Sequence, residues 1–358
     1  MGKMVLVAVI GVMLVSEVVG NWSALREKYD VEYWQDVFLD SQVTRGGKAR
    51  NVLSDYDLYA IVGYKYLHGD SPMNLHPEVP PLGKQIIGLG ILLFGNQNLI
   101  NFYIGLACLG LVYLLGRQLF GQSAPALASV LVLAVNGEFR HLLSSSNLDI
   151  PQLFFLLLSV AAFVKGIKVR YWFWLSSFSL GLMMATKFYF NGLILMGVYI
   201  LCLLILRRFE VFIRYIVSLI FVPLGYVLPY IPALIYQPDL IYFLKFQRWM
   251  TSWWAGNAGG TWGSIFPLIF TGWWKTWWGE TTDYIRVQEW DITWPILTTW
   301  GLTGIVKIVR KKDSKMFLIW LWPAVYLAFL AFTTPFPRYT AALFPFWSLL
   351  TVYLLTKK

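Results

Sequence analysis

Charged residues are scarce in this chain. Only 13% of its 358 residues are Asp, Glu, Lys or Arg, whereas 58% are hydrophobic, and the mean hydropathy is +0.59. Soluble domains carry about 25% charged residues, so this composition excludes an ordinary soluble fold. Repeated apolar runs close to the ~20 residues that cross a bilayer predict an all-α polytopic membrane protein.

Cysteine is also scarce, because Cys108 and Cys202 are the only two, and both lie in apolar runs. We expect both to be small buried hydrophobes, which excludes a disulfide framework and a thiolate metal site. The net charge is +10, yet the basic residues form short clusters between apolar runs. That pattern indicates membrane orientation, so we expect membrane lipids as partners and no nucleic acid.

The apolar runs predict about ten transmembrane helices in a single module, 1–358. The run near 4–19 is either a retained first helix, which we favour, or a signal peptide. The other expected spans are 100–115, 124–136, 150–164, 171–185, 192–206, 215–236, 294–306, 316–333 and 339–355. The segment 82–95 is too short to span comfortably and is expected to lie at the interface or to re-enter. With this count every basic cluster falls on the cytoplasmic side.

Two long outer segments remain, and both are expected to hold amphipathic helices. The first outer loop, 21–95, is acidic, and loops of such length are usually functional. The second, 237–293, contains Trp249, Trp253, Trp254, Trp262, Trp273, Trp274, Trp277, Trp278 and Trp290. These tryptophans predict either a belt at the outer leaflet or a stacking platform for sugar rings or lipid. All outer segments, including those near 136–149, 187 and 334–339, are expected to converge on one cavity.

Asp55 and Asp57 begin an amphipathic pattern in the first loop. A carboxylate near an apolar boundary can serve as a general base, whereas Ser54 and Asp are also common helix caps. Both interpretations stay open on spacing alone.

A second group of candidates follows at the sequence Pro80-Pro81-Leu82-Gly83-Lys84. Lys84 begins a helix, where it either completes an anion site or reaches toward lipid headgroups. His76 and Glu78 lie just before it and suggest a metal site only weakly, because no third ligand is clustered with them.

Other ionisable residues lie at the outer ends of later helices. Asp149 opens a helix after Glu138, Arg140 and His141, and is either a cap or a functional residue. Lys187 and Arg338 are outer cations with no topological reason to be there, and arginine suits bidentate contact with phosphate.

The order of these elements resembles the membrane glycosyltransferases of the GT-C type, in particular the protein O-mannosyltransferase and aminoarabinose-transferase branch. In that branch an Asp-Glu pair precedes an aromatic, a small residue and Leu-x-Gly, and the segment ends in His-Pro-Pro-Leu-Gly-Lys or Lys-Pro-Pro-Leu. Here the matching positions are Asp55, Tyr59, Gly63, Leu67, Gly69 and 80–84. Two positions depart from the pattern, since the pair is Asp-Tyr-Asp and Val79 replaces the His or Lys.

The resemblance implies transfer of a sugar, mannose or a similar hexose, from a polyprenyl-phosphate donor to an acceptor hydroxyl. The acceptor would be protein Ser/Thr, a lipid or a glycan at the outer face of the cell membrane. Asp55 or Asp57 would be the base of an inverting attack, with Asp149 orienting the acceptor or the base. The implied phosphate contacts are Lys84, Lys187 and Arg338, and the implied substrate contacts are Tyr59, His76, Glu78 and Tyr339. No cofactor is implied with certainty, and a divalent metal stays open.

Two other interpretations stay open from the sequence. A transporter or flippase of a lipid-linked sugar would use the outer charges as a gate, although no internal repeat is present. An inactive family member would bind the donor without turnover, which the altered Asp-Glu pair and Val79 leave open.

Overall fold

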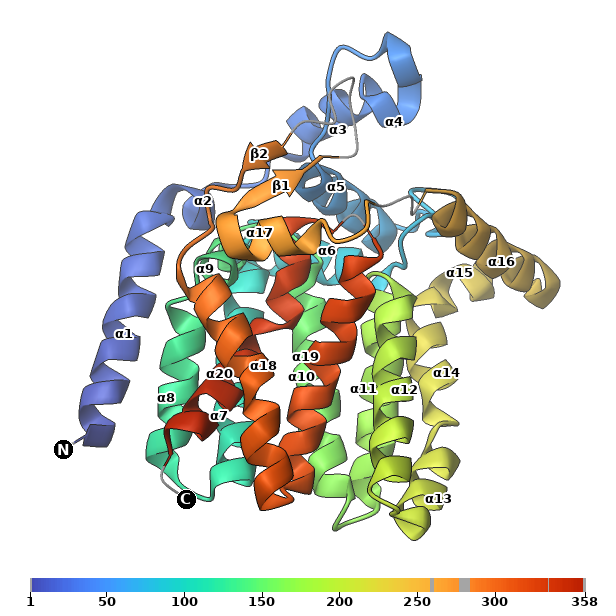
Figure 1. Cartoon of the computed structure of the whole chain (residues 1–358). Coiled ribbons are helices and arrows are strands. Elements are labelled where there is room, and N and C mark those ends of the chain that lie inside the picture. The colour runs from blue at the N-terminus through green and yellow to red at the C-terminus, as the bar shows by residue number, and fades with distance from the viewer. Residues whose placement is uncertain (1, 258–260, 277–283, 334, 357–358) are drawn as a thin grey trace.

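The structure is a computed structural model that describes residues 2–257, 261–276, 284–333 and 335–356. A bundle of upright helices carries a cap of short helices and one hairpin at one end (Figure 1). The bundle consists of α1 (Gly2–Gly20), α7 (Leu99–Phe120), α8 (Ser123–Ala134), α10 (Asp149–Gly166), α11 (Tyr171–Thr186), α12 (Tyr189–Ile205), α13 (Phe209–Ser218), α14 (Phe221–Val227), η2 (Leu228–Tyr230), α15 (Ile231–Tyr236), α18 (Thr293–Lys311), α19 (Ser314–Ala331) and α20 (Phe344–Leu355). The cap consists of α2 (Trp22–Arg26), α3 (Val31–Leu39), α4 (Gln42–Arg45), η1 (Gly46–Lys48), α5 (Asp55–Leu67), α6 (Leu82–Phe94), α9 (Gly137–Leu143), α16 (Leu240–Asn257), α17 (Ile265–Thr271), β1 (Trp273–Lys275), β2 (Tyr284–Arg286) and η3 (Pro337–Ala342).

The expected polytopic helical membrane architecture is confirmed, but the count of ten spans is not. Among the described residues, five helical segments are long and apolar enough to cross a membrane: α1, α7, α10, the broken segment 209–236, and α19. A sixth is added if α8 and α9, bent by 76°, count as one. The remaining expected spans are shorter helices, such as α12 and α20, or fall outside these criteria.

Two expected spans also differ in their boundaries. The span expected at 215–236 begins earlier, at α13, and is divided into α13, α14, η2 and α15. It contains Pro223, Pro229 and Pro232, and proline removes a helical hydrogen bond and clashes with the preceding turn. The span expected at 339–355 begins as the 3-10 turn η3, and its α-helix starts only at Phe344.

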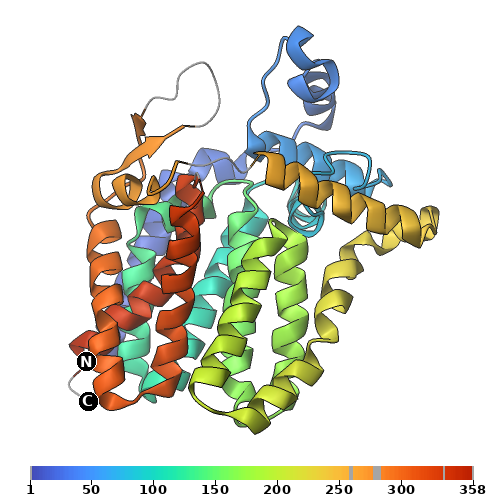
Figure 2. The ribbon, with the colours of Figure 1, turned by 45° about the vertical axis from the view of Figure 1, so that its right-hand side comes forward.

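The basic clusters lie at the end of the bundle away from the cap. The turns after α7, α10, α12 and α18 are all at that end, as are the start of α1 and the end of α20 (Figures 1 and 2). These turns carry Arg117, Lys165, Lys168, Arg170, Arg207, Arg208, Lys311 and Lys312. Positive loops mark the cytoplasmic side, so the cap is expected on the opposite, outer side.

Helix α6 does not cross the bundle, as expected for 82–95. Its first turn contacts the cap ends of α11 and α10, because a Cβ at Gly83 would meet the Thr186 carbonyl oxygen at 2.6 Å and Leu148 Cδ2 at 2.8 Å. Its other end meets the start of the cap, where Tyr29 N–H donates to Gly95 O at 2.8 Å. Both ends of α6 therefore lie at the cap.

The Trp-rich loop contains two separate parts. Helix α16 extends sideways from the cap, with Trp249 exposed, whereas β1 pairs antiparallel with β2 beside α17 (Figure 2). Trp274 on β1 is buried, and its indole N–H donates to Pro335 O at 2.8 Å. The expected tryptophans Trp277 and Trp278 lie outside the described residues.

Helix α5 is held against α6 by backbone contact. A Cβ at Gly63 would lie 2.0 Å from Lys84 O, and a Cβ at Gly88 would lie 2.3 Å from Gly63 O. The opposite face of α5 packs through Leu58 and Ile61 on Phe38 of α3. The position of the N-terminus of α5, where Asp55 lies, is thus set by two glycines.

We expect Gly88→Ala to lower the free energy of unfolding by about 1–3 kcal/mol, because the added methyl group has no space against backbone. Gly110→Ala on α7 is the matched control, since nothing lies within 4 Å of its added Cβ. Alanine in that helix should be neutral or stabilising by up to ~1 kcal/mol. Thermal unfolding of the detergent-solubilised variants measures both, and equal melting temperatures would contradict the close α5–α6 contact.

Candidate active site

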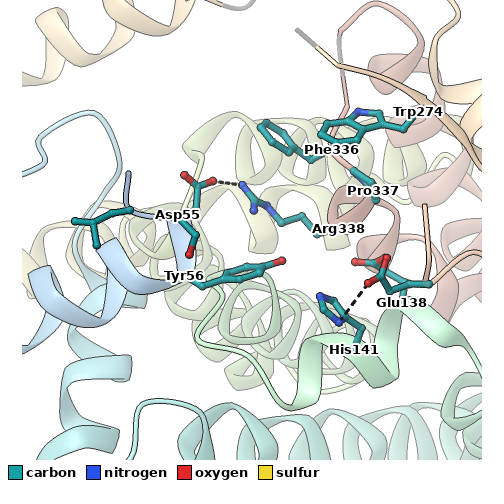
Figure 3. A pocket seen from close by; sticks show the side chains of 11 residues that line it. Asp55, Tyr56, Glu138, His141, Trp274, Phe336, Pro337 and Arg338 are labelled. Atoms are coloured by element: carbon teal, nitrogen blue, oxygen red, sulfur yellow. Dashed lines mark hydrogen bonds and ion pairs between the residues drawn. The ribbon is translucent and has the colours of Figure 1, made fainter. Parts of the chain in front are cut away.

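A cavity of about 590 Å³ opens at the cap end of the bundle. Its walls come from five segments far apart in the sequence: the start of α5, helix α9, strand β1, the segment before α18, and the turn at η3 (Figure 3). The lining residues are Leu53, Ser54, Asp55, Tyr56, Glu138, His141, Trp274, Glu289, Phe336, Pro337 and Arg338. Four of the outer segments expected to converge therefore do so here, and Lys187, from the fifth, contacts the same charge network.

Arg338 lies at the centre of that network. Its Nη2 donates to Asp55 Oδ2 at 2.5 Å, and its Nε lies 3.6 Å from Asp149 Oδ2. The side chain extends toward Asp55 across the cavity (Figure 3) and its guanidinium lies 4.4 Å from the centre of the Phe336 ring. One arginine thus joins carboxylates from the first outer loop and from the start of α10.

Asp149 and Lys187 form a second, more buried ion pair. Lys187 Nζ donates to Asp149 Oδ1 at 2.5 Å, with side chains 8% and 7% exposed. The ammonium also lies 4.4 Å from the centre of the Tyr339 ring. Asp149 does not cap α10, because Asn147 Oδ1 accepts from Ile150 N at 2.9 Å instead. Its carboxylate is therefore committed to the two cations.

The two aspartates at the start of α5 have different surroundings. Asp57 accepts a hydrogen bond from Ser54 Oγ at 2.7 Å, and its own N–H donates to the same hydroxyl, which is the N-cap of the helix. Asp55 lines the cavity and contacts Arg338. Ser54 is thus the helix cap and Asp57 is its partner, whereas Asp55 lines the cavity.

Lys84, His76 and Glu78 form a separate cluster behind α5. All three N–H groups of the buried Lys84 ammonium have partners in the chain, namely Val79 O at 2.7 Å, His76 O at 2.9 Å and His76 Nδ1 at 3.1 Å. The structure does not bring Lys84 to Lys187 or Arg338, and it lies outside the cavity lining. This lysine holds the 76–79 segment in place. Tyr59 joins the cluster, with its ring 5.9 Å from that of His76.

The protonation of His76 follows from these contacts. Burial, aided by the Lys84 charge, holds the pKa of His76 well below its ordinary value of 6.5. Since Nδ1 faces an ammonium that can only donate, the ring proton belongs on Nε2, which lies 3.3 Å from Glu78 Oε1. His76 is therefore a neutral link between Lys84 and Glu78.

Comparisons with known proteins now add to this geometry. The family model of dolichyl-phosphate-mannose-protein mannosyltransferases matches residues 78–236. The structure of ArnT from Cupriavidus metallidurans bound to undecaprenyl phosphate superposes with a TM-score of 0.65 at 16% identity, over 99% of this chain and 60% of that one. The chain has the same fold as ArnT. The apo form of ArnT gives a TM-score of 0.66 at 15% identity, over 97% of this chain and 59% of ArnT. The apo Archaeoglobus fulgidus oligosaccharyltransferase gives a TM-score of 0.55 at 12% identity, over 99% of this chain and 50% of that one.

The match to these GT-C structures concerns the fold. This chain spans about 60% of the length of ArnT and half of the oligosaccharyltransferase. No curated protein sequence matches it. The resemblance inferred from the sequence is confirmed, because the matched fold extends over nearly the whole chain.

Sequence reasoning did not select three ionisable residues of this cavity as site residues. Glu138 and His141 come from α9, and Glu289 comes from the end of the Trp-rich loop. Glu138 and His141 could have been found as ionisable residues just before the helix that Asp149 opens. Glu289 had no distinguishing signal, because Arg286 and Asp291 lie close to it in the sequence. Among the described residues, no group of three or more His, Cys, Asp or Glu side chains is placed to hold a metal ion.

Acid should destabilise the His76 cluster. Because the pKa of His76 is below 6.5 in the folded chain, the unfolded chain binds a proton at this residue more readily. The contribution of neutral His76 to the unfolding free energy is therefore present above pH 6.5 and is lost as the pH falls below that value. We expect a loss of up to ~1.4 kcal/mol per pH unit between pH 6.5 and 5.5.

His76→Asn is the control, because asparagine does not titrate there and tolerates the positive backbone φ of 50° at this position. Thermal unfolding from pH 7.5 to 5.5 should show a shallower pH dependence in this variant than in the wild type. Parallel pH profiles would show that His76 does not titrate on unfolding.

Removing one member of the buried Asp149–Lys187 pair should leave the other charge uncompensated. We expect Lys187→Met to lower the unfolding free energy by about 3–5 kcal/mol, a typical cost for breaking a buried ion pair. The double variant Lys187→Met, Asp149→Leu should recover much of that loss in chemical unfolding experiments. A double variant that is less stable than either single one would contradict the pairing.

Proposed function

We propose that this chain transfers a sugar from a polyprenyl-phosphate donor to an acceptor hydroxyl. The observation that carries the proposal is the arrangement around Arg338, which contacts a cavity carboxylate, Asp55, and a buried one, Asp149. A base candidate and two cations thus lie in one network, beside a cavity at the end of a membrane bundle. Glycosyl transfer from a lipid phosphate needs that combination.

In the proposed step, Asp55 takes the proton of the acceptor hydroxyl. The acceptor oxygen then bonds to the anomeric carbon, and the bond from that carbon to the phosphate oxygen breaks, which inverts the configuration. The leaving phosphate keeps the electron pair, and Arg338 and Lys187 stabilise its charge.

Asp149 has a positioning role in this proposal. Asp149 Oδ1 accepts a hydrogen bond from Lys187, and Asp149 Oδ2 faces Arg338 Nε. Asp149 Oδ2 and Arg338 Nε have no hydrogen-bond partner among the described residues. Arg338 Nε is thus a buried donor that a phosphate oxygen would satisfy. Lys84 reaches a phosphate only if the 76–79 segment moves, so we assign it to holding that segment.

The comparisons support a lipid phosphate as the donor's leaving group. One matching structure is ArnT bound to undecaprenyl phosphate, and another is the Archaeoglobus fulgidus oligosaccharyltransferase AglB in complex with an inhibitory peptide and a dolichol-phosphate. The family model names mannose, and we propose mannose or a similar hexose as the sugar. The basic turns opposite the cap support a site at the outer face of the cell membrane.

Sugar transfer by the purified chain in nanodiscs tests the proposal. Radiolabelled polyprenyl-phosphate sugars are supplied with peptide, lipid and glycan acceptors. We expect one donor to be consumed and Asp55→Asn to lower its consumption by about 10²–10⁴-fold, the usual contribution of a general base.

Asp57→Asn is the matched control, because it removes an equal charge two residues away without touching the cavity. We expect it to retain most of the activity and to lose at most ~1 kcal/mol of stability through the weakened cap. Equal activity losses in both variants would overturn the assignment of Asp55. A wild-type chain that consumes no donor would overturn the proposed function.

A further inference from the structure

The wall of the cavity opposite Asp55 is acidic and is not used by the proposed transfer step. Glu138 and His141 lie there on α9 (Figure 3), and Glu289 lies next to them, with His141 Nδ1 3.5 Å from Glu289 Oε1. We call Glu138 and Glu289 the acidic wall.

Contacts between the start of α9 and the segment before α18 place the two residues of the acidic wall together. Asp291 Oδ2 accepts from Gly137 N at 2.7 Å, and Asn136 Nδ2 donates to Thr293 Oγ1 at 3.2 Å. A Cβ at Gly137 would lie only 2.3 Å from Glu289 O. The end of the Trp-rich loop is thus fixed against the start of α9, so the wall is a built feature.

Glu138 lacks a partner in this arrangement. It is 2% exposed and lines the cavity, yet it makes no hydrogen bond or ion pair with any residue that the structure describes. Arg140, on the same helix, points elsewhere and donates to Glu17 Oε2 of α1 at 2.7 Å. Glu138 lines the cavity without a protein partner, so its carboxyl group is available to a ligand that supplies hydrogen-bond donors.

The charge distribution of the cavity therefore has two sides. The Arg338 side suits an anion, and the proposed donor phosphate belongs there. On the acidic wall, burial and the neighbouring charge of Glu289 raise the pKa of Glu138 to about 8, so the wall disfavours a further anionic group. Hydroxyl and ammonium groups would instead donate to the Glu289 carboxylate and to the carboxyl group of Glu138.

We propose that the acidic wall is the acceptor subsite and that it selects acceptors presenting hydroxyl or ammonium groups, against acceptors carrying phosphate. Calling the bound molecule an acceptor rests on the proposed glycosyl transfer, but the selection by charge is a property of the wall itself. It names the acceptor class as a neutral or cationic molecule, such as an unphosphorylated glycan or a peptide hydroxyl.

Binding of three matched methyl glycosides tests the selection without requiring turnover. The probes differ only at C6, which carries a hydroxyl, an ammonium or a phosphate group. Equilibrium dialysis uses the whole chain in nanodiscs with excess polyprenyl phosphate, so that the Arg338 side is occupied. We expect the ammonium probe to bind at least ~10-fold tighter than the phosphate probe, with the hydroxyl probe between them.

Glu138→Gln and Glu289→Gln keep the side-chain shape and remove the charge, and together they should reduce that ratio below ~3-fold. Glu32→Gln on α3 removes an exposed charge outside the cavity and should leave the ratio unchanged. Melting temperatures identify a variant that fails to fold, and the single substitutions then replace the double one.

Equal binding of the phosphate and ammonium probes, or an unchanged ratio in the glutamine variants, would overturn the inference. Donor consumption separates this outcome from a failure of the proposed function. Sugar transfer without charge selection overturns only the acceptor subsite. Charge selection in a chain that consumes no donor supports the selective wall and overturns the transfer.

Discussion

The cost of placing charge in an apolar bundle constrains this structure more than any other factor. The Asp149–Lys187 pair is nearly buried, and Arg338 connects it to Asp55 at the cavity. Burying such charges is costly, and a partner of opposite sign within contact distance offsets much of that cost. Segments that are far apart in the sequence therefore meet at one place, and that place is the cap end of the bundle.

The place where these charged segments meet was largely predictable from the sequence, because charge is costly in an apolar bundle and therefore conspicuous there. Lys187 and Arg338 stood out because they were outer cations without a topological role, and they do join Asp149 in one network. The re-entrant nature of 82–95 followed from its length and from the positions of the basic turns. Hydropathy and charge counting act on whole segments, so they predicted which end of the bundle carries the site.

Details of packing were not predictable. Spacing did not separate Asp55 from Asp57, because both lie in the first turn of α5 and only the direction of the side chains distinguishes the cap from the cavity residue. Lys84 looked like an anion ligand, yet its ammonium is fully used by the 76–79 segment. Glu138 and Glu289 meet through a glycine contact between segments about 150 residues apart, and no local pattern records such a contact. The count of ten spans is not confirmed, because several expected spans, such as α12 and α20, are helices shorter than 18 residues.

The crossing of α5 and α6 has a consequence for protein engineering. Gly63 and Gly88 bring the two helices together backbone to backbone, so neither helix tolerates a partner of different shape. A chimera that takes α5 from a protein of similar fold must therefore take α6 from the same protein, because the residues that set the crossing of the two helices lie on both of them. The unit of exchange is 55–94, with the Lys84 cluster inside it, and grafting 55–67 alone would displace the N-terminus that presents Asp55.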